Sequence, residues 1–442
     1  MKGGYVYEQE VATMKRRDLF KLAGWAAVAS SLPHSFRSYA AAGDYDGPLV
    51  LTIQVSGAWD VTSFCDPKMN VAGEETINNW ANTGEIQQAG NLLYAPFGNN
   101  AALFDKYHSY MLVVNGVDAQ TNSHSAGITH NWSGRLSAGY PTATALAASV
   151  HGPDLPMGYV SGGGYQETAN LTRYTSLSNP EGLAGLINGN IAIWDENLRY
   201  RHQGDLDRIK RYQMDKLLAM QDNPALTPRQ RNAIESYYQA RLSRDELAAF
   251  AAVLPSSDEL QDVVTVTGNI TSTLHRQAQV ALLGFQVGVG MAADLFVRGF
   301  DTHANHDQEH EPMLAHLADA IDYIWESAEQ LGLADRLVVF ATSDFARTPR
   351  YNSAAGKDHW SIGSALFMAK NASWGNRVIG ETDDMHSAYN ISPTTLERDD
   401  SGRHIYPGDI QRTLRVLTGV DQHENALKYP INTEGFMDLL ST

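Results

Sequence analysis

Cysteine is nearly absent from this chain of 442 residues, because Cys65 is the only one. A single cysteine excludes a disulfide within the chain and zinc sites built from several thiolates. Histidine and carboxylate side chains are therefore the candidate metal ligands of this sequence.

Positive charge is also scarce. The chain has 33 lysines and arginines against 50 acidic residues, a formal net charge of −17. Such a surface repels nucleic-acid phosphates and anionic lipids, so a nucleic-acid partner is not expected. Long apolar runs are missing too. Since a transmembrane helix needs about 20 apolar residues, the sequence predicts no membrane span.

The first motif that is present lies near the N-terminus. Arg16 and Arg17 precede an apolar run over residues 22–32, which is followed by the small-residue segment 39–42. This pattern is typical of a twin-arginine signal peptide with a cleavage site. We expect residues 1–42 to direct export through the twin-arginine translocase, and residues 43–442 to act in the periplasm or outside the cell.

Beyond residue 42, short apolar runs alternate with helical patterns. Strands are predicted at 48–55, 110–115, 291–298, 336–342 and 364–369, and helices at 127–136, 270–287, 311–331 and 409–418. This alternation indicates an α/β fold, with a mostly parallel sheet covered by helices on both faces. Residues 205–260 show charged and apolar residues at helical spacing, which predicts a helical insertion or a plain packing hairpin.

Three of the predicted strands are followed by an aspartate: Asp60, Asp301 and Asp344. In open α/β sheets, ligands bind outside the carboxyl ends of the strands, so these carboxylates are candidates for one site. The alternative is that each aspartate caps a helix or forms a turn.

The segment 301–310 contains three histidines and three acidic residues. Mixed histidine and carboxylate ligands suit zinc, manganese or iron, and a solvated acidic loop is the alternative. Two further clusters carry cations, Arg347 and Lys357, with His359 close behind. Cations beside metal ligands suit an oxyanion such as phosphate or sulfate, whereas the alternative is ion pairing with nearby carboxylates.

A fourth cluster, residues 121–132, contains Ser123, His124 and Ser125 at the start of a predicted helix. A hydroxyl group at a helix N-terminus near a metal ion can serve as a nucleophile. The alternative is that these residues only cap the helix.

These motifs in this order resemble the DUF1501 family, exported bacterial proteins of the alkaline phosphatase and sulfatase superfamily. The resemblance rests on Gly-Phe-Asp-Thr-His at 299–303, Ser-Asp-Phe-Ala-Arg-Thr-Pro at 343–349 and the Asp358-His359 pair. It implies an alkaline phosphatase-like three-layer sandwich with one or two divalent ions, Zn, Mn or Ca. By order along the chain, it implies these metal ligands: Asp60, Asp301, His303 or His306, Asp344 and His359.

Two positions depart from the superfamily pattern. Phe345 stands where a histidine ligand is expected, and His124 is a candidate replacement. Asn305 stands where the middle motif would place a histidine, so His303 or His306 would have to substitute.

The resemblance implies a hydrolase of phosphate or sulfate esters, acting on a small molecule or a polysaccharide. Ser123, Ser125 or a water activated by the metal would attack, Arg347 or Lys357 would hold the non-bridging oxygens, and His124 would assist proton transfer. The alternative is a non-catalytic cell-surface or carbohydrate-binding protein on the same fold. Convergence of the expected ligands would favour the enzyme, and the oligomeric state is left open.

Overall fold

An eight-stranded sheet forms the centre of the computed structural model, which describes residues 45–177, 190–192, 195–221, 258–431 and 435–441, with scattered positions between 223 and 256. The strand order is β16-β4-β15-β12-β1-β11-β5-β6. The bounds in chain order are β1 (Leu49–Ser56), β4 (Met111–Asp118), β5 (Tyr159–Ser161), β6 (Thr175–Ser176), β11 (Ala292–Arg298), β12 (Leu337–Ser343), β15 (Ile362–Ala369) and β16 (Arg377–Ile379).

The sheet is mostly parallel. Strand β1 pairs in parallel with β11 and β12, whereas β15 runs antiparallel to both β12 and β4. The carboxyl ends of β1, β11 and β12 therefore lie at the same edge of the sheet. All five predicted strands are present in it, and the predicted α/β class is confirmed.

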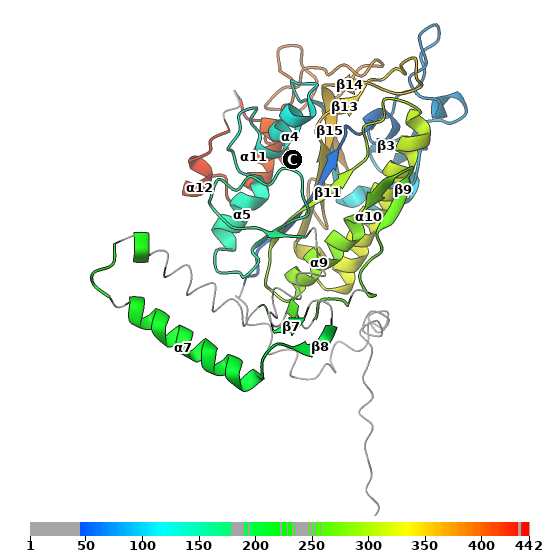
Figure 1. Cartoon of the computed structure of the whole chain (residues 1–442). Coiled ribbons are helices and arrows are strands. Elements are labelled where there is room, and N and C mark those ends of the chain that lie inside the picture. Colours follow the sequence, from blue (N-terminus) through cyan, green and yellow to red (C-terminus); the bar gives the residue numbers. More distant parts are fainter. Residues whose placement is uncertain are drawn as a thin grey trace, which may run out of the picture.

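Helices cover both faces of this sheet (Figure 1). On one side lie α4 (His124–Ser133), α5 (Ala143–His151), α11 (Pro407–Leu417) and α12 (Glu424–Leu427). On the other lie α3 (Asn100–Tyr107), α9 (Leu274–Gln286) and α10 (His306–Gln330). Helix α11 packs on α4 and α5, while α10 packs on α9 and α3. The arrangement is a three-layer sandwich.

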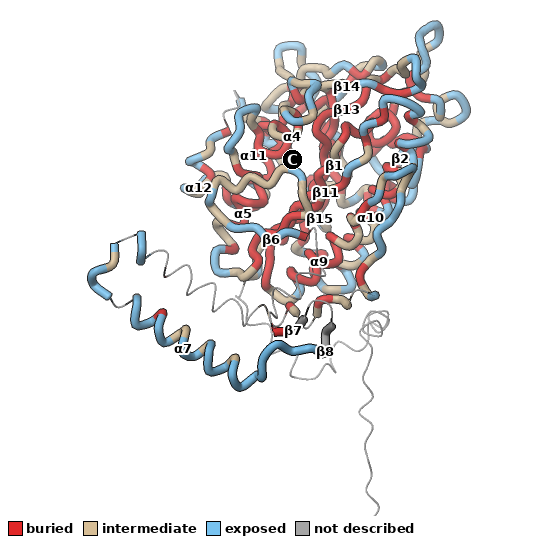
Figure 2. The backbone as a smooth tube through the Cα atoms, in the orientation of Figure 1, coloured by how far each residue is buried: buried red, intermediate tan, exposed pale blue. Residues whose placement is uncertain are grey.

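Alternate residues of the strands enter two different cores. In β4, Met111 and Val113 pack in a cluster that includes Leu317 of α10. Their neighbours Leu112 and Val114 pack in a cluster that includes Trp132, Ile410 and Leu414, from α4 and α11. Since successive side chains of a strand point to opposite faces, both faces must be apolar, which explains why the strands read as continuous hydrophobic runs. Figure 2 shows these central strands as buried.

Smaller elements surround the sheet. Within the described residues, four two-stranded ribbons pair β2 (Gln87–Ala89) with β3 (Leu92–Tyr94), β7 (Ile191–Ala192) with β8 (Asp195–Arg199), β9 (Val264–Thr267) with β10 (Ile270–Ser272), and β13 (Ala346–Arg347) with β14 (His359–Trp360). Short 3₁₀ turns are η1 (Val61–Ser63), η2 (Trp80–Asn82), η3 (His108–Tyr110) and η4 (Ala334–Arg336). The β13–β14 ribbon lies above the carboxyl edge of the sheet.

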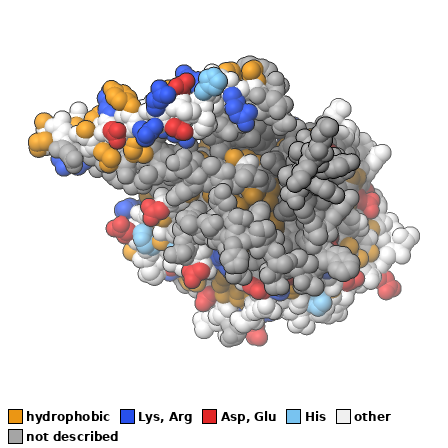
Figure 3. Space-filling view, turned by 90° about the horizontal axis from the view of Figure 1, so that it is seen from below, with side chains coloured by type: hydrophobic (Ala, Val, Ile, Leu, Met, Phe, Trp, Pro, Cys, Tyr) orange, Lys and Arg blue, Asp and Glu red, His pale blue; other side chains and the backbone are white. Residues whose placement is uncertain are grey.

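Helix α7 (Gln203–Gln221) lies in the segment predicted as a helical insertion, and it projects from the body of the molecule (Figure 1). Many later residues of that segment lie outside the described residues. From below, hydrophobic side chains on this arm alternate with basic and acidic ones (Figure 3). Residues 1–42 lie outside the described residues, so the signal peptide and its boundary stay predictions. None of the helices in the described ranges is both long and apolar enough to span a bilayer.

Candidate metal centre

Three segments meet at the carboxyl edge of the sheet. The loop after β11 carries Asp301 and His303, the first turn of α4 carries His124, and the β13–β14 ribbon carries His359. Gly57 allows the loop after β1 to lie against them. Its φ is +112°, and a Cβ atom there would lie only 2.5 Å from the backbone nitrogen of Asp301. Side chains far apart in the sequence thus come together.

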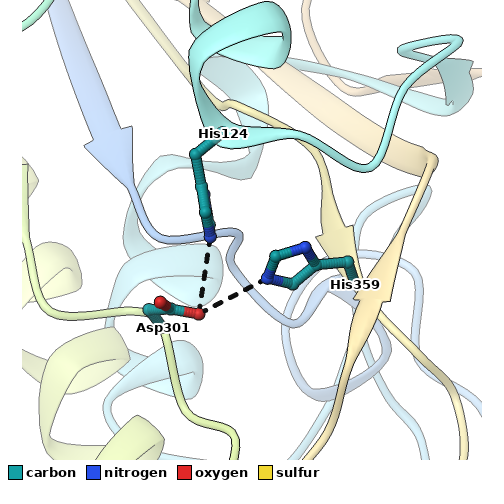
Figure 4. A group of neighbouring side chains, drawn as sticks. All are labelled: His124, Asp301 and His359. Carbon is teal, nitrogen blue, oxygen red and sulfur yellow. Dashed lines mark ion pairs between the residues drawn. The ribbon is translucent and has the colours of Figure 1, made fainter.

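Three imidazole rings surround one carboxylate oxygen. Asp301 Oδ1 lies 3.1 Å from His303 Nε2, 3.5 Å from His124 Nε2 and 3.6 Å from His359 Nε2. The Nε2 atoms of His303 and His359 are 3.0 Å apart. Figure 4 shows His124 and His359 pointing at Asp301 from two different elements. One potential ligand atom from each of His124, Asp301 and His359 lies within 4.8 Å of the other two.

The opposite nitrogen of each ring has its own partner. His124 Nδ1 lies 2.5 Å from Asp344 Oδ2, and His303 Nδ1 lies 2.9 Å from Asp358 Oδ1. His359 Nδ1 lies 2.7 Å from the backbone oxygen of Asn122. Acceptors at Nδ1 favour the proton there, which leaves the lone pair of each Nε2 free, although that of His303 also lies 3.5 Å from Arg347 Nη1. Histidines that ligate metal ions are held in this way by carboxylates and carbonyls.

These residues fit a divalent metal ion. His124 Nε2 is buried and has no hydrogen-bond partner, although buried polar atoms are normally paired. A metal ion at the centre would satisfy it. His124, Asp301 and His359 supply ligand atoms that all lie close to one another, and His303 Nε2 lies beside them, 3.1 Å from Asp301 Oδ1. Imidazole nitrogens with a carboxylate oxygen suit zinc or manganese better than calcium, which prefers oxygen ligands.

Arg347 lies beneath the carboxylate and is fully buried. Its Nη2 is 2.5 Å from Asp301 Oδ1, its Nε donates to the oxygen of Ala58 at 3.0 Å, and its Nη1 donates to the oxygen of Lys357 at 3.0 Å. Burial opposes ionisation of Asp301, but the Arg347 guanidinium outweighs it and holds the pKa of that carboxyl below its usual range. Arg347 therefore positions Asp301, whereas the sequence predicted a direct contact with substrate.

Asp344 was expected to be a metal ligand but lies behind His124. Its Oδ1 accepts hydrogen bonds from the backbone nitrogen of Ala58 at 2.7 Å and from the Ser343 hydroxyl at 2.8 Å. The hydrogen bond to Asp344 raises the pKa of His124 above its ordinary value. The structure therefore places His124 among the converging side chains and makes Asp344 its orienting partner.

Asp60 and His306 are not brought to this centre, contrary to the expectation from the sequence. Asp60 Oδ2 lies 2.7 Å from Lys357 Nζ and 3.0 Å from His306 Nε2. All three side chains are completely buried. Lys357, which was expected to hold substrate oxygens, therefore has its ammonium group inside the protein.

The two candidate nucleophiles lie at the first turn of α4, beside His124. Ser123 and Ser125 are exposed, and their hydroxyl oxygens are 3.3 Å apart. In the part of the chain that the structure describes, neither hydroxyl is hydrogen-bonded to any of the three histidines. Both remain accessible from solvent at the positive end of the helix.

The family profile described as "Protein of unknown function (DUF1501)" matches residues 50–426. The chain belongs to this family. No curated protein matches this DUF1501 sequence.

Several solved structures share a distant likeness with this DUF1501 protein. A structure of i-CgsB in complex with k-i-k-neocarrahexaose is 8% identical, with a TM-score of 0.39 over 89% of this chain and 76% of that one. The PsFucS1 sulfatase from Pseudoalteromonas sp. is 11% identical, with a TM-score of 0.37 over 96% and 75%. The alkaline phosphatase from the Antarctic bacterium TAB5 is 9% identical, with a TM-score of 0.34 over 85% and 100%. Likeness at this level says nothing about the chemistry of this chain.

Sequence reasoning missed the side chains and carbonyls that hold the histidines. Asp358 was noted only as the neighbour of His359, and Asn122 only as part of the serine cluster. Asp358 also accepts a hydrogen bond from Asn352 Nδ2 at 3.0 Å, and the same amide group donates to the oxygen of His303 at 3.0 Å. The position of Asp358 next to His359, a predicted ligand, was the sequence feature that could have indicated its role.

Proposed function

We propose that this DUF1501 protein is a metal-dependent hydrolase of phosphate or sulfate esters. The observation that carries the proposal is the convergence of three imidazole Nε2 atoms on Asp301 Oδ1, each ring being held from behind at Nδ1. Such preorganisation is characteristic of metal ligands and serves no evident packing purpose. The resemblance of the sequence motifs to the alkaline phosphatase and sulfatase superfamily supports ester hydrolysis as the reaction class.

The residues of the chain would hold a divalent ion through His124, Asp301, His303 and His359. When bound, the ion would act as a Lewis acid that polarises the ester. Arg347 keeps Asp301 ionised and oriented, and Asp344 keeps the His124 proton on Nδ1. These two buried residues thereby maintain the ligand set before any substrate arrives.

Either Ser123 or Ser125 would provide the attacking oxygen. Both hydroxyls lie at the N-terminus of α4, a helix of ten residues. The free backbone N–H groups and the dipole of a helix N-terminus favour an anion such as a phosphoryl or sulfuryl group. The helix would therefore bind the oxyanion next to the nucleophile.

The substrate would be met outside the cytoplasm. The twin-arginine pattern around Arg16 and Arg17 supports export, and the acidic composition opposes nucleic-acid substrates. A small-molecule or polysaccharide ester is the class of substrate that we propose.

The test is metal analysis combined with an ester screen. Protein stripped with chelator is reconstituted with Zn, Mn or Ca and assayed with aryl phosphates and aryl sulfates. We expect Asp301→Asn and His303→Ala to lose bound metal and turnover together. His108→Ala is the matched control, because His108 precedes β4 at the opposite edge of the sheet. A protein that binds no metal and hydrolyses no ester refutes the proposal.

The alternative, a non-catalytic binding protein, has a separate outcome in the same experiment. Convergence of the metal ligands expected from the sequence was taken as the sign of an enzyme. Of the ligands Asp60, Asp301, His303, Asp344 and His359, three meet here: Asp301, His303 and His359. His124 joins them, while Asp60 and Asp344 have other partners. Tight metal binding without hydrolysis of any ester would favour the binding protein.

A further inference from the structure

The ammonium group of Lys357 lies in a closed cage of oxygen atoms beneath the metal centre. Nζ is 2.7 Å from Asp60 Oδ2, 2.9 Å from Asn78 Oδ1 and 3.2 Å from Thr62 Oγ1. A lysine ammonium has three N–H donors, and the cage supplies three acceptors. Lys357, Asp60 and Asn78 are all 0% exposed, so bulk solvent does not reach these contacts.

The cage oxygens are oriented by other groups as well as by Lys357. Asn78 Nδ2 donates to the backbone oxygens of Thr62 at 3.2 Å and Lys68 at 2.9 Å, which leaves Oδ1 turned inward. Asp60 Oδ1 accepts from the backbone nitrogen of Thr62 at 3.0 Å. Ser63 Oγ lies 3.0 Å from both Asp60 Oδ2 and Asn78 Oδ1. The arrangement has the chemistry of a site for a hard cation, which prefers oxygen ligands.

A chain of hydrogen bonds determines the protonation of the histidines beside the cage. The backbone N–H of Asp60 donates to His310 Nε2 at 2.8 Å, so His310 carries its proton on Nδ1 and donates to Thr302 Oγ1 at 3.1 Å. Thr302 then donates to His306 Nδ1 at 2.7 Å, and His306 Nε2 donates to Asp60 at 3.0 Å. Both rings are neutral in this chain. The charge that balances Asp60 is therefore that of Lys357.

We propose that Lys357 is a built-in cation that occupies the place of a second metal ion, so that the chain binds one divalent ion and not two. The number of divalent ions, one, rests on the proposed function, because it assumes an ion at His124, Asp301, His303 and His359. The cage itself does not depend on that assumption. Asp60, expected from the sequence to hold a metal ion, holds this ammonium instead.

The cage also anchors the loop that carries His359. The backbone nitrogen of Lys357 donates to the oxygen of Thr302 at 3.1 Å, and its backbone oxygen accepts from Arg347 Nη1 at 3.0 Å. Gly356 allows this loop to lie directly against the backbone of His303, since a Cβ atom there would overlap that residue's carbonyl group. Lys357 is thus a positioning residue for the neighbouring centre.

The experiment replaces the ammonium group with a free amine. Full-length, metal-free Lys357→Ala protein is melted in sodium, ammonium, methylammonium and tetramethylammonium chloride at equal ionic strength. We expect its Tm to fall well below that of the wild type and to rise with ammonium or methylammonium concentration. Tetramethylammonium has no N–H donor and should not help. Wild type and Lys370→Ala, which removes a lysine from a surface pair with Glu329, should not respond to amines.

A Lys357→Ala protein that is folded and indifferent to every amine overturns the cage proposal. If this variant does not fold, refolding yield with and without methylammonium gives the same comparison. The double variant Asp60→Asn/Lys357→Met, which has neither charge, should fold and should show no response to amines. An amine response of the double variant equal to that of Lys357→Ala would also overturn the proposal.

Analysis of metal content tests the number of bound ions separately from the cage. We expect one equivalent of Zn or Mn in the wild type, retained in Asp60→Asn. Two equivalents, one of which is lost in Asp60→Asn, would overturn the inference. Absence of metal together with a clear amine response would refute the proposed function and the count, and would leave the cage intact.

Discussion

Replacing Asp344 with asparagine tests whether the carboxylate behind His124 sets metal affinity. Asp344 Oδ1 faces two donors, the backbone nitrogen of Ala58 and the Ser343 hydroxyl. Its Oδ2 faces His124 Nδ1 and the backbone nitrogen of Gly57, at 2.5 Å and 3.3 Å. An asparagine has only one oxygen, so its NH₂ group must face one of these two sets of donors.

If the asparagine oxygen takes the place of Oδ1, its NH₂ group faces His124 Nδ1. The ring would then carry its proton on Nε2, the nitrogen that points at the centre. Binding a metal ion would require that proton to return to Nδ1, with loss of a hydrogen bond to a charged group, about 1.5–3 kcal/mol. This corresponds to roughly a 10–100-fold loss of metal affinity.

The assay is competition between Asp344→Asn protein and a chromogenic chelator for Zn. Asp319→Asn is the matched control, because Asp319 also pairs with a histidine, His275, at 3.1 Å but lies on α10 outside the centre. We expect the control to bind metal as the wild type does. An Asp344→Asn protein with wild-type affinity and a native fold would contradict the reasoning that the Asp344 carboxylate, through His124, sets metal affinity.

Three further predictions concern stability. Burial raises the pKa of Asp294, so its protonated form is favoured in the folded state, and the stability it contributes is lost as pH rises through the folded pKa. In urea titrations from about pH 4, near the ordinary pKa of an aspartate, upward, Asp294→Asn should therefore become more stable relative to the wild type as pH rises, and an unchanged difference would contradict this. Lys357→Met leaves Asp60 buried and unpaired and should cost about 3–5 kcal/mol, part of which the double variant Asp60→Asn/Lys357→Met recovers. A cost below about 1 kcal/mol in urea denaturation would show that the pair is not buried as described. Gly57→Ala should reduce both Tm and metal binding, whereas Gly332→Ala, with φ of +70° and open space around it, should reduce only Tm.

The strands and the chemical character of the loops could be predicted because they depend on local sequence. Strand β12, for example, is apolar along its length because helices cover both faces of the sheet, and its residues form a continuous hydrophobic run that can be recognised in the sequence. Asp301 was a candidate because it follows a strand and begins a segment rich in histidine and acid, and the family resemblance implied His303 and His359 as further ligands. The twin-arginine pattern is likewise a local signal, and export stays a prediction.

The division of the polar residues between two sites could not be predicted, because it depends on contacts across the whole chain. Lys357 meets Asp60 across 297 positions, and His124 meets Asp344 across 220. No local pattern shows which cation neutralises which carboxylate, or which aspartate lies behind a histidine.

The α/β class, the family and the loops that carry the polar clusters can be read from the sequence alone, since periodicity and motifs are properties of neighbouring residues. Which side chains face the centre depends on the fold as a whole. The partners of a buried carboxylate follow from desolvation and hydrogen bonding in three dimensions. Asp60 therefore meets an ammonium group, Asp344 meets a histidine, and His124 lies beside Asp301 and His359.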